Sequence, residues 1–248
     1  MNETTLGTSR LRAYFALVLG YVFGAASLIW FGWFLWVGSH QIVDLKLGTP
    51  MALALDGLLA IAFFVQHSGM IRKSFRRRLA AVLPVQYHPA VFATASGVVL
   101  SLLLVLWQLS RVCVFSLDGP SSWLVRGVFL VGIAGLVWGV ASLGYFDLFG
   151  RRAILAHLRG RPAQALPLTI RGPYRWVRHP LYASILLLIW ACPSVPADRL
   201  LFNVLWTVWI VVATLLEERD LAAEFGEAYQ KYQRSVPMLV PWKLRPGN

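Results

Sequence analysis

Four apolar runs, each long enough to cross a lipid bilayer, constrain the fold of this chain more than any other feature. They occupy residues 14–37, 51–70, 89–109 and 123–146. A helix needs about 20 predominantly apolar residues to cross the hydrocarbon core of a membrane. Only 14% of the residues are charged, whereas ordinary soluble domains contain about 25%. The sequence therefore predicts an all-α integral membrane protein.

Two further apolar segments follow in the second half of the chain. Residues 181–192 are short for a full crossing, and residues 200–216 form a longer return segment. The connection between them, residues 193–198, contains two prolines, which interrupt helices and restrict the preceding residue. With the four long runs, this helical hairpin predicts five to six membrane helices.

Two other patterns describe how the helices pack. The fourth run is rich in glycine, and small residues allow membrane helices to approach closely, so we expect this helix to pack centrally. Residues 217–235 place Leu221, Phe225, Tyr229 and Tyr232 on one face of an amphipathic helix. We expect that tail helix to fold back on the cytoplasmic side. Residues 1–248 are interpreted as one membrane domain, with a four-helix part (1–146) and a second part (147–242) holding the hairpin and tail.

The distribution of positive charge predicts the orientation. With the N-terminus inside, all but four of the 23 Lys and Arg residues lie on the cytoplasmic side, where such residues are enriched. The four exceptions are Lys46, Arg111, Arg126 and Arg199. Both termini and both ends of the hairpin are then cytoplasmic. The net charge of +12 is explained by topology and by contact with lipid headgroups, and no nucleic-acid-binding motif is present.

Ionisable residues mark the point where the basic connection enters the hairpin. Arg178 and His179 precede Pro180, a residue that suits the first turn of a helix. The backbone N–H groups at a helix N-terminus favour an anion, so the carboxylate of a cofactor would fit beside them. The alternative is that Arg178 extends to a lipid phosphate.

A second polar group closes the hairpin at Glu217 and Glu218. Neighbouring residues of a helix do not face the same way. One glutamate can therefore point inward, toward an ammonium or ribose group, while the other points outward or toward Arg178. A simple cluster of charges with Arg219 and Asp220 at a helix end is the alternative.

These two groups carry a resemblance to a known family. The pattern Gly-Pro-Tyr-x-x-x-Arg-His-Pro-x-Tyr at 172–182, followed by Glu-Glu-x-x-Leu-x-x-x-Phe-Gly-x-x-Tyr-x-x-Tyr at 217–232, resembles the isoprenylcysteine carboxyl methyltransferase and phospholipid methyltransferase superfamily. Gln-His-Ser-Gly-Met at 66–70 and Phe-Asp-Leu-Phe-Gly at 146–150 resemble, more narrowly, bacterial methanethiol S-methyltransferases and NnrU-related membrane proteins. The resemblance implies an S-adenosylmethionine-dependent enzyme of a bacterial inner membrane.

Carried onto this sequence, the resemblance implies a set of cofactor-binding residues: Gly172, Pro173, Tyr174, Arg178, His179, Tyr182, Glu217 and Glu218. It also implies that the early spans form a lipid-accessible chamber for an apolar substrate. Arg178, Glu218 and His67 are the candidate catalytic residues. His67 could act as a general base for a thiol, because the thiolate is the nucleophile and histidine titrates near neutrality. A packing histidine bonded to a backbone carbonyl is the alternative.

The motifs define the methyl acceptor and the partners less closely than they define the cofactor. We expect S-methylation of a small thiol, such as methanethiol giving dimethyl sulfide. The alternatives are a prenylcysteine carboxylate, a lipid amine or another hydrophobic acceptor, and a non-catalytic NnrU-like membrane factor. Asp56 and Asp147 are secondary candidates for chemistry. The cysteines and histidines show no metal-ligand spacing, so no metal is expected, and the oligomeric state is left open.

Overall fold

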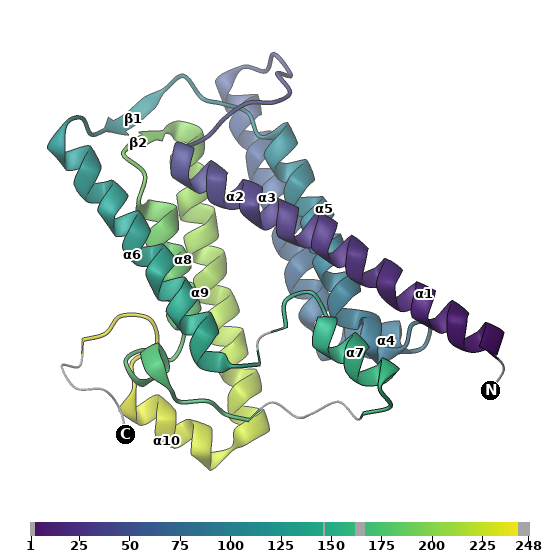
Figure 1. Cartoon of the computed structure of the whole chain (residues 1–248). Helices are drawn as coiled ribbons and strands as arrows, with labels where there is room; N and C mark the ends of the chain where they lie inside the picture. Colours follow the sequence, from purple (N-terminus) through teal and green to yellow (C-terminus); the bar gives the residue numbers. More distant parts are fainter. Residues whose placement is uncertain (1–2, 146, 162–166, 243–248) are drawn as a thin grey trace.

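The predicted all-α membrane fold is confirmed by a computed structural model, which describes residues 3–145, 147–161 and 167–242 (Figure 1). Within these residues, the helical segments long and apolar enough to cross a membrane are Arg10–Val37, Thr49–Ile71, Val85–Leu106, Pro120–Leu143 and Ala197–Phe225. A shorter apolar helix covers Pro180–Trp190. Residue Phe146, at the predicted boundary between the two parts of the domain, lies outside the described residues.

The N-terminal half contains α1 (Glu3–Leu19), η1 (Gly20–Ala25), α2 (Ala26–Val37), α3 (Thr49–Ile71), α4 (Lys73–Ala80), η2 (Val85–Tyr87) and α5 (His88–Leu106). The C-terminal half contains β1 (Cys113–Ser116), α6 (Pro120–Leu143), α7 (Arg151–Leu158), η3 (Gly172–Arg175), α8 (Pro180–Trp190), β2 (Ser194–Pro196), α9 (Ala197–Phe225) and α10 (Glu227–Ser235). The predicted membrane runs therefore form helices, and α4, α7 and two short strands occupy segments predicted as connections.

The first membrane helix passes very close to α5. It is continuous through α1, η1 and α2, and Figure 1 shows it lying diagonally across α3 and α5. A Cβ atom built on Gly97 would lie only 2.3 Å from the carbonyl oxygen of Phe23 and 2.9 Å from the backbone nitrogen of Gly24. Backbone thus touches backbone at the π-helical turn η1, and the absence of a side chain at position 97 sets the distance between these two helices.

An aromatic layer joins the two halves of the bundle. Trp206 of α9 stacks on Phe31 and Phe63, with ring centroids 4.8 and 5.3 Å apart. Offset and edge-to-face aromatic pairs stabilise a fold beyond the area that they bury. The largest buried cluster combines residues of α2, α3, α5, α8 and α9, including Phe34, Phe63, Leu104, Trp107, Ile189, Phe202 and Trp206. This layer holds α9 against the N-terminal helices.

Helix α6 packs closely, but at the edge of the bundle. Cβ atoms built on Gly132 and Gly139 would lie within 3 Å of the side chains of Leu188 and Leu181 of α8, so the small residues admit one neighbouring helix. The opposite face of α6 is exposed, including Leu130 and Val137. The predicted close packing of α6 is confirmed. The predicted central position is wrong, because Gly132, Gly135 and Gly139 lie along one side of the helix and contact α8 alone.

Helix α8 is too short to cross a membrane. Its 11 residues extend about 16 Å, about half of a hydrocarbon core roughly 30 Å thick. Backbone carbonyls inside a membrane need a partner, and Arg199 supplies one by donating to the carbonyl oxygen of Ile189 (3.2 Å). Arg199 also donates to Phe34 and Leu35 at the end of α2, at 3.1 and 3.3 Å.

The position of Arg199 corrects the sequence interpretation. We assigned it to an external connection as a topology signal, but its side chain is completely buried. It lies over the rings of Phe34 and Phe202, with the guanidinium carbon 5.2 and 5.3 Å from the ring centroids. Arg199 is therefore an internal cap for two helix ends.

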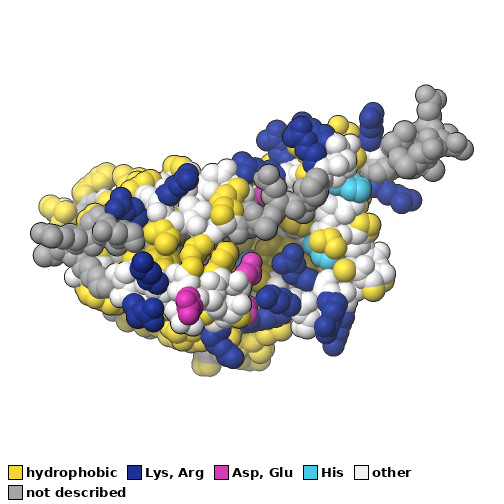
Figure 2. Space-filling model, turned by 90° about the horizontal axis from the view of Figure 1, so that it is seen from below, with side chains coloured by type: hydrophobic (Ala, Val, Ile, Leu, Met, Phe, Trp, Pro, Cys, Tyr) yellow, Lys and Arg dark blue, Asp and Glu magenta, His cyan; other side chains and the backbone are white. Residues whose placement is uncertain are grey.

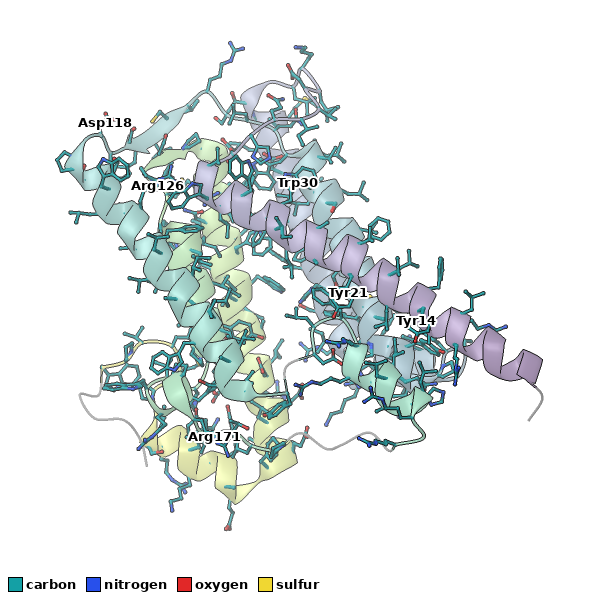
Figure 3. All side chains as sticks on the ribbon, viewed as in Figure 1. Tyr14, Tyr21, Trp30, Asp118, Arg126 and Arg171 are labelled. Atoms are coloured by element: carbon teal, nitrogen blue, oxygen red, sulfur yellow. The ribbon has the colours of Figure 1, made fainter. Side chains whose placement is uncertain are left out.

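The two ends of the bundle differ in structure. At one end, β1 pairs with β2 in an antiparallel arrangement, in segments where we predicted only a loop and a turn. Figure 3 places Asp118 and Arg126 at this end and Arg171 at the opposite end. We call the opposite end, which carries α4, η3 and α10, the arginine-rich end. The first described residues of α1 also lie there (Figure 1).

The predicted tail helix is divided in two. Helix α9 continues without interruption from the membrane to Phe225, and the chain then turns at Gly226, whose φ of +55° lies in the left-handed region. Glycine enters this region without steric cost. The predicted apolar face is confirmed, because Tyr229 and Tyr232 are buried in a cluster with Leu221 and Phe225. The prediction of one helix over residues 217–235 is wrong, and the turn at Gly226 directs α10 back under α9.

The contact between η1 and α5 can be tested by substitution. Gly97→Ala should lower the free energy of unfolding by about 1–3 kcal/mol, because the new methyl group forces two backbones apart. Gly32→Ala is the matched control, since a Cβ there meets nothing within 4 Å. Thermal unfolding in detergent should separate the two variants. Equal stability of both would show that the helices are not in backbone contact.

Candidate active site

A buried ion pair between Arg178 and Glu218 organises the arginine-rich end. The Nε of Arg178 donates to Oε1 of Glu218 at 2.8 Å, and Nη2 donates to Oε2 at 2.9 Å. The side chains are only 11% and 9% exposed. This two-point geometry fixes the start of α8 against the end of α9, which the sequence places 40 residues apart.

Glu218 receives hydrogen bonds from three further side chains. The nearest nitrogen of His179 lies 2.6 Å from its Oε1, the hydroxyl of Tyr229 donates to Oε1 at 2.8 Å, and the amide of Gln233 donates to Oε2 at 2.6 Å. Burial, and then the bond to Glu218, raise the pKa of Tyr229 above its ordinary value, so this hydroxyl keeps its proton. The Glu218 carboxylate is thus surrounded by protein donors.

The tail of the chain closes over Arg178. Its Nη1 donates to the carbonyl oxygens of Gln233 (2.9 Å) and Val236. The backbone nitrogens of Arg178 and His179 donate to the carbonyls of Pro237 (2.8 Å) and Met238 (3.1 Å). The guanidinium therefore does not extend to lipid, as the alternative interpretation proposed. Of its five N–H donors, two hold α10 and the chain after it in place, and two bind Glu218.

Glu217 differs sharply from its neighbour. Its side chain is 45% exposed, and its Oε2 lies 3.9 Å from the Nδ1 of His179. The ring of His179 stacks on Tyr182 with centroids 5.7 Å apart. Burial, and then the charge of Glu217, raise the pKa of Tyr174. The structure thus separates the two glutamates: Glu218 is enclosed, and Glu217 is an accessible carboxylate beside aromatic rings.

The predicted residues Gly172 and Pro173 lie where η3 meets α6. Gly172 adopts a φ of +53°, and a Cβ there would lie 2.2 Å from Oγ of Ser142. Pro173 is buried, and the hydroxyl of Tyr232 donates to the carbonyl of Tyr174 at 2.5 Å. These contacts hold η3 between α6 and α10.

His67 lies deeper in the bundle than this cluster. Its ring packs against Phe92 (4.8 Å) and Trp209 (5.4 Å). Trp209 precedes Glu217 by eight residues of α9, which is about 12 Å along the helix axis. The Nδ1 of His67 is buried without a hydrogen-bond partner. The structure therefore brings all the predicted cofactor residues together and places His67 apart from them.

The secondary candidates have structural roles. Asp56 accepts a hydrogen bond from the backbone of Gln108 (2.9 Å) and so connects α3 to the chain after α5. Asp147 accepts hydrogen bonds from the backbone nitrogens of Arg152 and Ala153 at the start of α7, as a helix-capping residue does. Across the described ranges, His, Cys, Asp and Glu side chains form no cluster able to hold a metal ion.

Sequence reasoning missed two residues of the cluster, Tyr229 and Gln233. The apolar spacing of the tail helix did indicate that Tyr229 faces inward, but not that its hydroxyl reaches Glu218. Figure 2 shows the arginine-rich end, with Lys and Arg side chains spread around it and a few acidic side chains near its middle. An accessible carboxylate on this basic face is suited to a cationic or polyhydroxyl ligand.

The Arg178–Glu218 pair can be tested by removing the arginine. Arg178→Ala should lower the free energy of unfolding by about 3 kcal/mol or more, because a buried carboxylate loses its partner. Hydrogen exchange should also become faster in α10, which the guanidinium holds. Arg219→Ala removes the same charge from an exposed neighbouring position and serves as the control. Unchanged exchange in α10 would contradict the anchoring role.

Comparison with known proteins identifies the family. The chain is 38% identical to a methanethiol S-methyltransferase of a Pseudomonas species over 197 residues, which cover 77% of this chain and 74% of that protein. It is 32% identical to the methanethiol S-methyltransferase of Mycobacterium tuberculosis over 238 residues, 92% of this chain and 98% of that protein. It is also 28% identical to Nurim of Danio rerio over 182 residues, 69% of this chain and 65% of that protein.

No family model matches the chain, and no solved structure matches it. The methanethiol S-methyltransferase relatives nevertheless cover most of the sequence. They confirm the family and the methyltransferase class predicted from those motifs. The chain belongs to the methanethiol S-methyltransferase family.

Proposed function

We propose that this protein uses S-adenosylmethionine to methylate a small thiol, with methanethiol as the first candidate and dimethyl sulfide as the product. The observation that carries the proposal is the contrast between the two glutamates. An enclosed Glu218 fixes the architecture, and an accessible Glu217 is available to a ligand. The names of the relatives support the choice of a thiol acceptor.

The residues around Glu217 fit the proposed cofactor. Its carboxylate can accept hydrogen bonds from an ammonium or from ribose hydroxyls, and such charge-assisted bonds are the stronger ones. The ring of His179, 3.9 Å from this carboxylate, stacks on the ring of Tyr182, and aromatic faces attract cations. The first turn of α8 can receive a carboxylate at its backbone N–H groups. When bound, S-adenosylmethionine supplies an activated sulfonium methyl for in-line transfer.

Arg178 and Glu218 act in this proposal as positioning residues. Their contacts are with each other and with α10, so they hold His179, Tyr182 and Glu217 in one arrangement. Correct placement of two reactants can contribute about 7–11 kcal/mol to catalysis. A rigid frame is therefore a sufficient role for these two residues, without contact between Arg178 and the cofactor.

His67 stays the proposed base for the acceptor. Its unpartnered Nδ1 lies among aromatic rings of α3, α5 and α9, and an apolar surrounding suits a small neutral thiol. The N-terminal helices, residues 1–146 in our division, provide this part, and residues 147–242 provide the cofactor part. A larger acceptor, such as a prenylcysteine carboxylate or a lipid amine, is the alternative to be distinguished by an acceptor screen.

We further propose that the arginine-rich end faces the cytoplasm of a bacterial inner membrane. Both ends of the hairpin, α4 and α10 lie at this end, and it carries most of the Lys and Arg residues. Such residues are enriched in cytoplasmic segments. The proposed cofactor would then be available from the cytoplasm.

Titration of S-adenosylhomocysteine into the detergent-purified protein tests the cofactor site. Wild-type protein should bind it, and Glu217→Gln should weaken binding about tenfold or more, because a charge-assisted hydrogen bond is lost. The free energy of unfolding should change little, since this side chain is 45% exposed and outside the buried Arg178–Glu218 pair. Arg219→Ala is the control for a charge change in the same turn. Wild-type affinity in Glu217→Gln would remove this residue from the site.

The role of His67 is tested by turnover of methanethiol. His67→Ala should lower kcat about 100-fold or more, as expected for loss of a general base, while affinity for S-adenosylhomocysteine stays within twofold. His67 does not contact the Glu217 cluster in the described structure, which is why the two effects should separate. An equal loss of turnover and affinity would assign His67 a structural role.

A further inference from the structure

An apolar pocket lies at the end of α3, and its lining includes no residue of the Glu217 cluster. It has a volume of about 190 Å³ and is lined by Met70, Ile71, Arg76, Leu79, His88, Pro89 and Phe92. These residues come from the end of α3, from α4 and from the start of α5, so the pocket opens at the arginine-rich end. Nothing in the site described above uses it.

The pocket contains a buried histidine with one unused nitrogen. His88 is only 5% exposed. Its Nε2 lies 3.1 Å from the carbonyl oxygen of Leu83. A carbonyl can only accept, so Nε2 carries the proton and Nδ1 presents a lone pair. The Nδ1 is buried and has no hydrogen-bond partner. The lining as a whole is mostly apolar, which favours a ligand that is small and largely apolar.

Phe92 connects this pocket to the interior of the bundle. It lines the pocket, and its ring also packs on His67, with centroids 4.8 Å apart. Phe92 is therefore the side chain that separates the pocket from the ring of His67. Arg76, also in the lining, adds a positive charge, which favours a thiolate over a thiol.

We propose that this pocket is the entry site for the small thiol acceptor, from which it passes Phe92 to reach His67. This inference rests on the proposed function. A molecule such as methanethiol matches the pocket in three respects: it is small, it is mostly apolar, and its thiolate form carries a charge opposite to that of Arg76. Two non-hydrogen atoms fit easily in about 190 Å³, since one water occupies about 30 Å³ in the liquid.

The pocket can be filled from α4 without touching the cofactor cluster. Leu79→Trp adds a large ring to the lining, and Ala80→Trp adds a ring of the same size at the next, exposed position, which does not line the pocket. Steady-state kinetics with methanethiol should show a rise in KM of about tenfold or more for Leu79→Trp, with kcat within twofold of wild type. Ala80→Trp should match wild type. Affinity for S-adenosylhomocysteine should be the same in all three proteins.

Enlarging the pocket gives an independent test. Leu79→Ala should lower the KM for 1-butanethiol relative to that for methanethiol by about fivefold or more, since each buried methylene changes binding by roughly tenfold or more. Identical KM values in Leu79→Trp, Ala80→Trp and wild type, with no gain for 1-butanethiol in Leu79→Ala, would overturn the entry site. Wild-type protein that binds S-adenosylhomocysteine but methylates no thiol would instead refute the proposed function, and the entry site with it.

Discussion

The buried pair of Arg178 and Glu218 is the interaction on which the rest of the arginine-rich end depends. Removing two charges from water is costly, and their attraction offsets that cost only when the geometry is good and the other donors and acceptors are also satisfied. Here the remaining bonds are made by His179, Tyr229, Gln233 and the backbone carbonyls of the tail. The pair is therefore stable only when α8, α9 and α10 are all in place.

Buried polar groups in the interior of the bundle also depend on partners from distant parts of the chain. A membrane offers no water to backbone groups, so each interrupted helix needs an internal partner. Arg199 provides it for the carbonyls at the ends of α2 and α8. Asp198 accepts from Trp107 Nε1 and from the backbone of Ser110. These bonds allow α8 to end partway through the membrane. The C-terminal half therefore pairs the short helix α8 with the long helix α9.

The sequence predicted the parts of this fold that depend on composition and period. Apolar length identified the membrane helices, and Pro180 marked the start of α8. Sequence reasoning failed where tertiary contacts decide. The burial of Arg199 depends on carbonyls that are far away in sequence, and glycine spacing shows that α6 approaches another helix closely but not how many neighbours it has. The turn at Gly226 was overlooked because the apolar period continues across it.

The residues of the site could be predicted from the sequence, but the separate roles of Glu217 and Glu218 could not. Two adjacent glutamates read identically in a sequence. Only the position of α10 shows that one is enclosed by Tyr229 and Gln233 and that the other remains accessible. His67 was named from its motif, yet its depth relative to Glu217 depends on how α3 packs along α9. The motifs thus identified the residues of the site, whereas their burial and their neighbours depend on how the helices pack.

The backbone bonds from Arg178 and His179 to Pro237 and Met238 have a consequence for biosynthesis. The start of α8 cannot acquire its final partners until about 60 further residues have been translated and α9 has been inserted. During this interval the guanidinium of Arg178 has neither Glu218 nor the tail carbonyls to bind. Until the later segments are made, this arginine is an unpaired charge, for which water or lipid phosphate is the favourable surrounding. The site thus assembles only after the last helices have left the ribosome.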